Sequence, residues 1–181
     1  RATDANKNID KDYTGNHTLV FSGLNTVGTL PNVYSPKIEN TLFGYNITVS
    51  FSQGLSASSG VTLTAYKKES NAVLTQESGR SYGQHGLAAT INAGAASNLA
   101  LLSGNNQSGR TAWPLPQAFV VAVTDTYGNG IGAGTGVNFA ILSQPQGASG
   151  TSLSTASGVT DANGEASTTL TIGSAAGDRK S

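Results

Sequence analysis

Oxygen-bearing side chains alternate at the start of the sequence. They belong to Asp4, Asn6, Asn8, Asp10 and Asp12. Oxygen ligands at every second residue are typical of a calcium-binding loop, in which a glycine makes the sharp turn and a glutamate closes the coordination shell. Here Ile9 stands where the glycine is expected, and no glutamate closes the loop. Because Asp and Asn side chains also hold tight turns, calcium binding and a purely structural turn are both open at this point.

Two further features bear on catalysis. His17 and His85 are the only histidines, and a Ser-His-Asp arrangement would need one of them as its base. Each stands alone among polar or small residues, so we expect both at the surface. The glycine-rich segment 128–136 lacks a following Lys-Ser/Thr pair and precedes a β-rich segment, whereas a phosphate loop opens a helix. We therefore predict that the chain is not an enzyme and assign no catalytic, cofactor-binding or metal-binding residues.

Aromatic residues offer a possible sugar-binding surface. Tyr34, Tyr82 and Trp113 could present flat faces to the apolar faces of sugars, and Trp113 is the only tryptophan. Trp113 also begins the stiff sequence Trp-Pro-Leu-Pro. We predict that its ring closes the end of a β-sandwich or a junction between domains.

Covalent modification is a further hypothesis. A Lys–Asn or Lys–Asp isopeptide cross-link would draw on lysines and carboxylates such as Lys37, Lys67, Lys68, Glu39 and Glu69. The pairing cannot be derived from the sequence. Asn16, Asn46 and Asn106 each begin an Asn-x-Ser/Thr sequon, a glycosylation signal that arises by chance in a chain this rich in Ser, Thr and Asn.

The composition suits a secreted β-protein. The 181 residues include 23 Gly but no Cys and no Met, which excludes thiol chemistry and disulfides. Ten basic residues balance ten acidic ones, so no basic field attracts nucleic acid or an anionic membrane. No apolar run approaches the roughly 20 residues that span a bilayer. The sequence begins at Arg1 without a signal peptide, and we expect a processed or excised segment of a longer protein.

Apolar and polar residues alternate in many short segments, which predicts strands rather than helices. The expected strands are 18–21, 45–51, 61–66, 72–75, 99–102, 118–124, 137–142 and 166–172. Gly, Asn, Asp, Ser and Pro clusters separate them at the spacing of a β-sandwich. A connector of small residues at 91–97 predicts two domains, 1–94 and 95–181.

A short phrase recurs in the two predicted domains. Thr3-Asp4 and Thr124-Asp125 are each followed by a turn centred on asparagine and then by apolar residues. The copies are separated by roughly one Ig-sized unit of about 100 residues. Such self-similarity is the signature of an array of like domains.

The second half of the sequence resembles a bacterial Ig-like domain of the Big-1 (invasin/intimin) type. The residues that carry the resemblance are 99–109, 115–129, 136–141 and 160–166, above all the turns Thr-Asp-x-Tyr-Gly-Asn and Thr-Asp-x-Asn-Gly-x-Ala. Residues 1–92 are similar, more weakly, to a related Ig-like repeat. The resemblance implies two tandem Ig-like antiparallel β-sandwiches without enzymatic activity, used in stalks, adhesins and extracellular fibres.

Both predicted sandwiches depart from this pattern at the chain ends. Only Arg1-Ala2 precedes the first Thr-Asp phrase, and the second domain lacks a segment for its final strand. We therefore expect both sandwiches to be incomplete, either because the ends are trimmed or because another chain supplies a strand.

The expected function follows from this resemblance. The leading hypothesis is a non-enzymatic stalk or spacer module of a bacterial surface protein, located outside the cell. Its partners would be neighbouring Ig-like domains or identical subunits joined by β-strand addition. One alternative is a subunit of an extracellular filament or pilus completed by strand exchange, and a second is a module that binds carbohydrate or a cell-surface receptor. We expect no nucleic acid partner, no membrane insertion of this segment and no cofactor.

Overall fold

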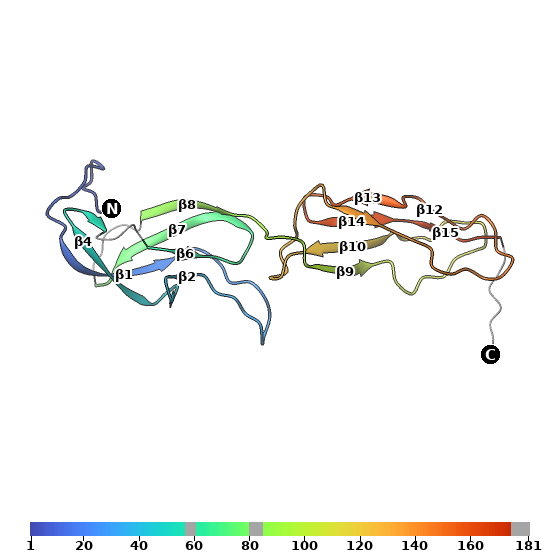
Figure 1. Ribbon diagram of the computed structural model, residues 1–181, viewed down its shortest axis with the longest axis horizontal. Coiled ribbons are helices and arrows are strands. Elements are labelled where there is room, and N and C mark those ends of the chain that lie inside the picture. The colour runs from blue at the N-terminus through green and yellow to red at the C-terminus, as the bar shows by residue number, and fades with distance from the viewer. Residues whose placement is uncertain (57–60, 80–84, 175–181) are drawn as a thin grey trace. The chain divides into compact units, whose positions relative to one another are not determined.

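Every regular element of the protein is a β-strand in the residues that the structure describes. The described residues are 1–56, 61–79 and 85–174 of the computed structural model (Figure 1). All strand pairs between them are antiparallel. The predicted all-β, antiparallel class is therefore confirmed. The chain forms two compact units, Arg1–Asn92 and Ala93–Ser181, whereas the sequence placed the boundary after residue 94.

Unit 1 contains eight strands in its described part. They are β1 (Gly15–Ser22), β2 (Lys37–Ile38), β3 (Thr41–Leu42), β4 (Asn46–Ser52), β5 (Leu55–Ser56), β6 (Leu63–Thr64), β7 (Glu69–Glu77) and β8 (His85–Ile91). A five-stranded sheet has the order β5-β4-β1-β7-β8, and a small sheet has the order β3-β2-β6.

The core of unit 1 lies between these two sheets. Leu19 and Phe21 alternate along β1 and are buried beside Val49 of β4 and Val73 of β7. Ile38, from the small sheet, belongs to the same cluster and is only 3% exposed. The predicted half-buried strand at 45–51 is present as β4, because Ile47, Val49 and Phe51 all turn toward the core.

Unit 2 contains seven described strands. They are β9 (Asn98–Ser103), β10 (Phe119–Thr124), β11 (Gly136–Asn138), β12 (Ser152–Leu153), β13 (Ser157–Val159), β14 (Glu165–Thr168) and β15 (Leu170–Thr171). One sheet has the order β14-β10-β9, while β11 pairs with β13 and β12 pairs with β15. Its buried apolar cluster is smaller, comprising Val123, Val137 and Ala166.

The predicted strand at 166–172 serves two sheets. Glu165–Thr168 pairs with β10, but the chain changes partner at Thr169. The Thr169 N–H donates to the Ser154 hydroxyl at 2.8 Å, and Leu170–Thr171 then pairs with β12. The sequence pattern is continuous across this change because both sheets need apolar residues on the inner face.

The predicted strand at 137–142 is mostly wrong. Regular pairing covers only Gly136–Asn138, and one more bond follows, from the Phe139 N–H to the Ala156 carbonyl at 2.9 Å. Beyond it the apolar residues Ile141 and Leu142 are 38% and 94% exposed. Strand β8, which contains glycine and two alanines, was not predicted, because small residues give little β signal.

Ile38 should be the most sensitive small-sheet position of unit 1. We expect Ile38→Ala to destabilise unit 1 by about 2–5 kcal/mol, because the side chain is buried and truncation leaves a cavity. Leu30→Ala is the matched control, since Leu30 is 88% exposed and its truncation should cost little. Urea unfolding followed by circular dichroism measures both, and equal losses would contradict the assignment of the core.

Candidate functional site

The repeated Thr-Asp phrase forms a turn built around one carboxylate oxygen. In unit 2, Asp125 Oδ1 accepts the backbone N–H groups of Tyr127 and Asn129, both at 2.9 Å. The Asp125 N–H in turn donates to the Asn129 carbonyl at 2.9 Å. Gly128, between the two donors, has a φ of 86°, which a glycine adopts without steric cost. The side chain thus closes a five-residue loop onto its own backbone.

The same turn occurs at two other places. Its donors are again the N–H groups two and four residues after the aspartate: Asn6 and Asn8 for Asp4, and Asn163 and Glu165 for Asp161. All four of these distances lie between 2.8 and 2.9 Å. The left-handed position is filled by Lys7, with a φ of 69°, and by Gly164, with a φ of 84°. The repeated Thr-Asp sequence therefore forms the same hydrogen-bonded turn in both units.

Asp125 differs from the other two aspartates in its burial. It is 2% exposed, while Asp4 and Asp161 lie at the surface. Its second oxygen, Oδ2, accepts the Asn129 side-chain amide and the Gly94 N–H, both at 2.9 Å. Burial raises the pKa of the Asp125 carboxyl, but the hydrogen bonds from Asn129, Gly94 and Tyr127 outweigh it and hold the pKa below its usual value.

This carboxylate attaches the start of unit 2 to the turn. Besides the Gly94 contact, the Ser97 N–H donates to the Thr124 carbonyl at 2.8 Å, and the Asn98 amide donates to the Asp125 carbonyl at 3.0 Å. Only Asn92 and Ala93 separate the end of β8 from the first attached residue. The predicted small-residue connector is therefore held at its C-terminal end by defined hydrogen bonds.

The two turns of unit 2 also pack against each other. The Val123 N–H donates to the Gly164 carbonyl at 2.8 Å. A Cβ atom at Gly130 would lie 1.9 Å from the Asn163 carbonyl oxygen, so this contact requires glycine. The glycine-rich segment 128–136 thus fits one turn against the other and then enters β11, and it does not open a helix.

The calcium alternative receives no support from this geometry. Both Asp4 oxygens accept hydrogen bonds within the turn, since Oδ2 contacts the Asn8 amide at 3.2 Å. Hydrogen bonds from the Asn8 side chain and backbone and from the Asn6 N–H lower the pKa of Asp4, against a small opposing effect of burial. Asp10 Oδ1 accepts the Asp12 N–H at 3.1 Å. Across residues 1–56, 61–79 and 85–174, no three acidic or histidine side chains converge as a metal site would require.

His17 is not a surface residue, which corrects the prediction for it. Its side chain is 15% exposed, and its Nδ1 lies 2.8 Å from Glu77 Oε1. The ring stacks on Tyr13 at a centroid distance of 3.7 Å, and Phe51 meets it edge-on. These contacts join β1, β4 and β7 structurally, and no serine hydroxyl takes part in them. The side chain of His85 lies outside the described residues.

Residues 79–83 have the Gly-x-Ser-x-Gly spacing of a hydrolase nucleophile elbow, which the sequence reasoning overlooked. An elbow requires a strand before the serine and a helix after it. Here β7 precedes the segment, but the next element is the strand β8. Residues 80–83 themselves lie outside the described part of the chain.

The aromatic candidates are divided between the two units. Tyr34 belongs to unit 1, where its ring lies 5.5 Å from that of Tyr66, while Trp113 belongs to unit 2 and Tyr82 lies outside the described residues. Trp113 is 59% exposed, with the Arg110 guanidinium 5.6 Å from its ring centroid. The prediction that Trp113 closes a sandwich end or a junction is therefore wrong, because the ring faces solvent.

The carboxylates considered for a cross-link hold loops in place. Glu39 accepts the Thr62 N–H at 2.6 Å, and Glu69 accepts the Asn25 N–H at 2.8 Å together with the Asn25 side chain. Burial raises the pKa of Glu69, while Asn25, Asn71 and the charge of Lys67 lower it below its usual value. A cross-link at Lys37, Lys67 or Lys68 remains a prediction.

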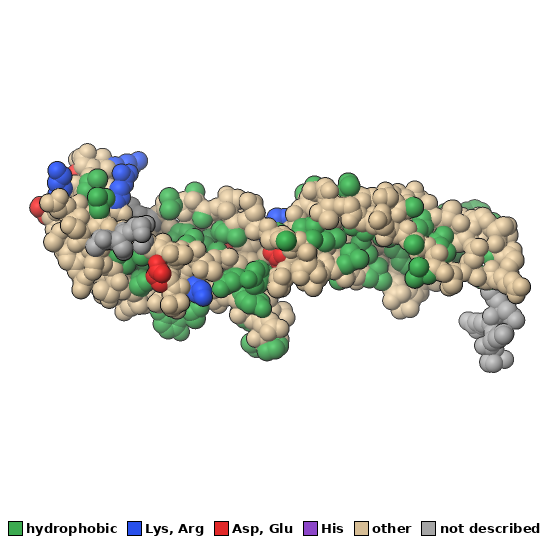
Figure 2. Space-filling model, in the orientation of Figure 1, with side chains coloured by type: hydrophobic (Ala, Val, Ile, Leu, Met, Phe, Trp, Pro, Cys, Tyr) green, Lys and Arg blue, Asp and Glu red, His purple; other side chains and the backbone are tan. Residues whose placement is uncertain are grey.

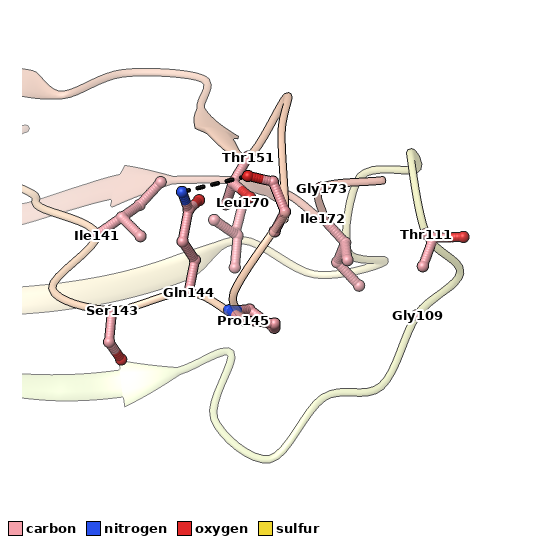
Figure 3. A pocket seen from close by; sticks show the side chains of 11 residues that line it. Gly109, Thr111, Ile141, Ser143, Gln144, Pro145, Thr151, Leu170, Ile172 and Gly173 are labelled. Atoms are coloured by element: carbon pink, nitrogen blue, oxygen red, sulfur yellow. Dashed lines mark hydrogen bonds between the residues drawn. The ribbon is translucent and has the colours of Figure 1, made fainter. Parts of the chain in front are cut away.

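A hollow of about 330 Å³ lies at the end of unit 2 that is remote from Asp125 (Figure 3). Ile141, Leu170 and Ile172 line it together with Gln144, whose amide lies 3.5 Å from the Ala148 carbonyl. None of its lining residues is charged. Its polar lining consists of neutral side chains such as Thr111, Ser143 and Gln144, and we assign no ligand to it.

No helix in the described part of the chain combines the length and the apolar character needed to cross a membrane.

The chain matches no protein-family model, and it is similar to no curated protein and to no solved structure at a significant level. The Big-1 resemblance thus remains a prediction.

The Asp125 carboxylate should be essential for the stability of unit 2. We expect Asp125→Asn to destabilise it by about 1.5–3 kcal/mol, since the new amide would face donors such as the Gly94 N–H. Because the folded pKa is lowered, the carboxylate's contribution is present above the unfolded value of about 3.9 and is lost as pH falls through the folded pKa. Urea unfolding at several pH values, followed by Trp113 fluorescence, measures both effects.

Asp4→Asn is the matched control for this prediction, because the same turn is there exposed to solvent. Its loss should be clearly smaller, since water can satisfy the donors that the carboxylate releases. Equal losses at Asp4 and Asp125 would contradict a special role for the buried turn.

Gly130 should tolerate no side chain. We expect Gly130→Ala to destabilise unit 2 by at least about 1–3 kcal/mol, because the methyl group would overlap the Asn163 carbonyl. Gly136→Ala is the control in the same unit, since a Cβ atom there meets nothing within 4 Å. Thermal unfolding compares them, and a Gly130→Ala protein as stable as the wild type would show that the turns do not pack as described.

Proposed function

We propose that the chain is a non-enzymatic structural module of a bacterial surface protein, in which two Ig-like units act as a stalk or spacer outside the cell. The observation that carries the proposal is the attachment of the connector to the buried Asp125 turn. A spacer needs units that stay folded and a connection that does not extend freely. The first of these bonds is made by Gly94, so only Asn92 and Ala93 lie between the end of β8 and the first residue bonded to the Asp125 turn.

The recurrence of the turn supports the Ig-like reading of both units. The same carboxylate-centred loop stands in unit 1 at Asp4 and in unit 2 at Asp125 and Asp161. In arrays of like domains, the same local turns and contacts recur from one unit to the next. The two-layered core of unit 1 agrees with a β-sandwich.

A filament subunit completed by strand exchange is the second candidate. An apolar face beside β9 that no described strand covers favours it. No comparable observation favours a carbohydrate- or receptor-binding module, since the three aromatic candidates do not come together on one unit.

The spacer proposal predicts that the connector limits the motion between the units. Because the chain has no cysteine, spin labels can be placed at the exposed positions Leu87→Cys and Val159→Cys. We expect insertion of Gly-Ser-Gly-Ser after Asn92 to make the distance distribution between the labels at least about twice as broad. Double electron–electron resonance measures this width.

The same insertion after Gly147 is the control, because that loop lies within unit 2 and a Cβ atom there meets nothing within 4 Å. It should leave the width unchanged. A wild-type distribution already as broad as that of the Asn92 insertion would contradict the spacer proposal.

A further inference from the structure

The inner face of unit 2 continues onto an edge strand where nothing described covers it. In the β9–β10 pair, Leu99 lies opposite Val123 and Leu101 opposite Val121. Directly opposed residues of an antiparallel pair share one face of the sheet. Val123 is buried in the core cluster and Val121 packs against it, so Leu99 and Leu101 are on the core face.

These two leucines are nevertheless exposed. Leu99 is 63% and Leu101 48% exposed, while Val123, in the next strand, is 7% exposed. Figure 2 shows hydrophobic side chains gathered over β9 and β10 on the face in view. Two large apolar side chains on a core face gain stability only when another layer covers them.

Unit 1 shows how such an edge is completed. Its edge strand β8 contributes Ala89 and Ile91, which are partly buried and pack against the core cluster that includes Ile38. In unit 2 the opposing layer over the sheet is β11, whose Val137 meets Val123 in the core. Strand β11 pairs with β13 alone among the described strands, so its other edge has no strand partner among them.

The edge of β9 has none of the usual protections of an exposed strand. The sequence Asn98–Ser103 contains no proline and no charged residue, although exposed edges commonly carry lysine or proline to prevent pairing with other chains. The surroundings are also uncharged, because neither 93–109 nor 126–160 contains an acidic residue, a basic residue or a histidine. A complementary partner is therefore uncharged as well.

We propose that this core face is an acceptor site for one β-strand of a partner polypeptide, an uncharged extended segment with large apolar side chains at alternate positions. The strand pairs with the unpaired edge of β11 and places its apolar side chains on Leu99 and Leu101. Main-chain hydrogen bonds to β11 supply affinity, and the alternate apolar side chains supply specificity. The proposal goes beyond the spacer function and holds for any donor chain, whether or not the protein forms filaments.

A peptide of defined sequence tests the site. The probe is the acetylated and amidated segment 44–52 of this chain, which is uncharged and has Ile47, Val49 and Phe51 at alternate positions. The control peptide carries Asn in place of Ile47 and Val49. We expect the probe, but not the control, to bind the full chain, as measured by isothermal titration calorimetry at peptide concentrations up to about 1 mM.

Variants of β9 distinguish the acceptor face from other sheet edges. The double variant Leu99→Asn, Leu101→Asn should bind the probe at least tenfold more weakly. Ala100→Asn should bind it like the wild type, because Ala100 lies opposite Ala122 on the other face. Equal binding by all three proteins, or no binding to the wild type, would overturn the proposal.

Chemical-shift mapping keeps the test valid if the double variant does not fold. In the wild-type protein, the probe should shift the amide signals of 99–101 and 137–141, and shifts confined to β5, β8 or β14 would overturn the proposal. Sedimentation of the chain without peptide distinguishes the acceptor-site proposal from the filament candidate. A monomer that binds the probe at these residues supports the acceptor site and contradicts only the filament candidate.

Discussion

The aspartate carboxylate that accepts two N–H groups of its own turn is the interaction on which the fold is organised. The Asp side chain is short enough to reach the N–H groups two and four residues ahead, which would otherwise need water or another strand. Once the loop closes, the residues on either side are brought opposite each other. The bridges Thr3–Ile9 and Thr124–Gly130 flank the turns at Asp4 and Asp125 in this way. A local bond thereby closes a short antiparallel bridge, for which the entropy cost of loop closure is small.

Because Asp125 is buried, its turn makes more hydrogen bonds than the other two copies. Placing a carboxylate out of water is costly unless donors replace the lost solvent, and Asp125 has four: the N–H groups of Tyr127, Asn129 and Gly94 and the Asn129 amide. The Gly94 donor comes from the connector, so the electrostatic requirement of one buried group determines where unit 2 begins. Asp4 meets no such requirement, because water reaches it. The same phrase in the sequence is thus a surface turn in one unit and an anchor in the other.

Local sequence patterns predicted much of the fold, but they did not predict the buried site around Asp125. Alternation in 45–51 and 118–124 predicted β4 and β10, because one-sided burial gives a strand a period of two. The Thr-Asp motif located all three turns, including the one at Asp161, but it could not distinguish Asp4 from Asp125, since burial depends on residues distant in sequence such as Gly94. His17 was misread for the same reason: its partners Tyr13, Phe51 and Glu77 come from three other segments.

The difference between the two cores follows from how each edge is completed. In unit 1 a second sheet covers the five-stranded one, and six buried apolar residues form a continuous cluster. In unit 2 the described strands cover β10 and β14 but leave the core face of β9 in contact with solvent. Hydrophobic burial would favour closing this face with a neutral strand, since no charge on the surrounding segments opposes it. Unit 2 therefore combines a buried carboxylate whose oxygens both accept hydrogen bonds with an apolar face on β9 that none of the described strands covers.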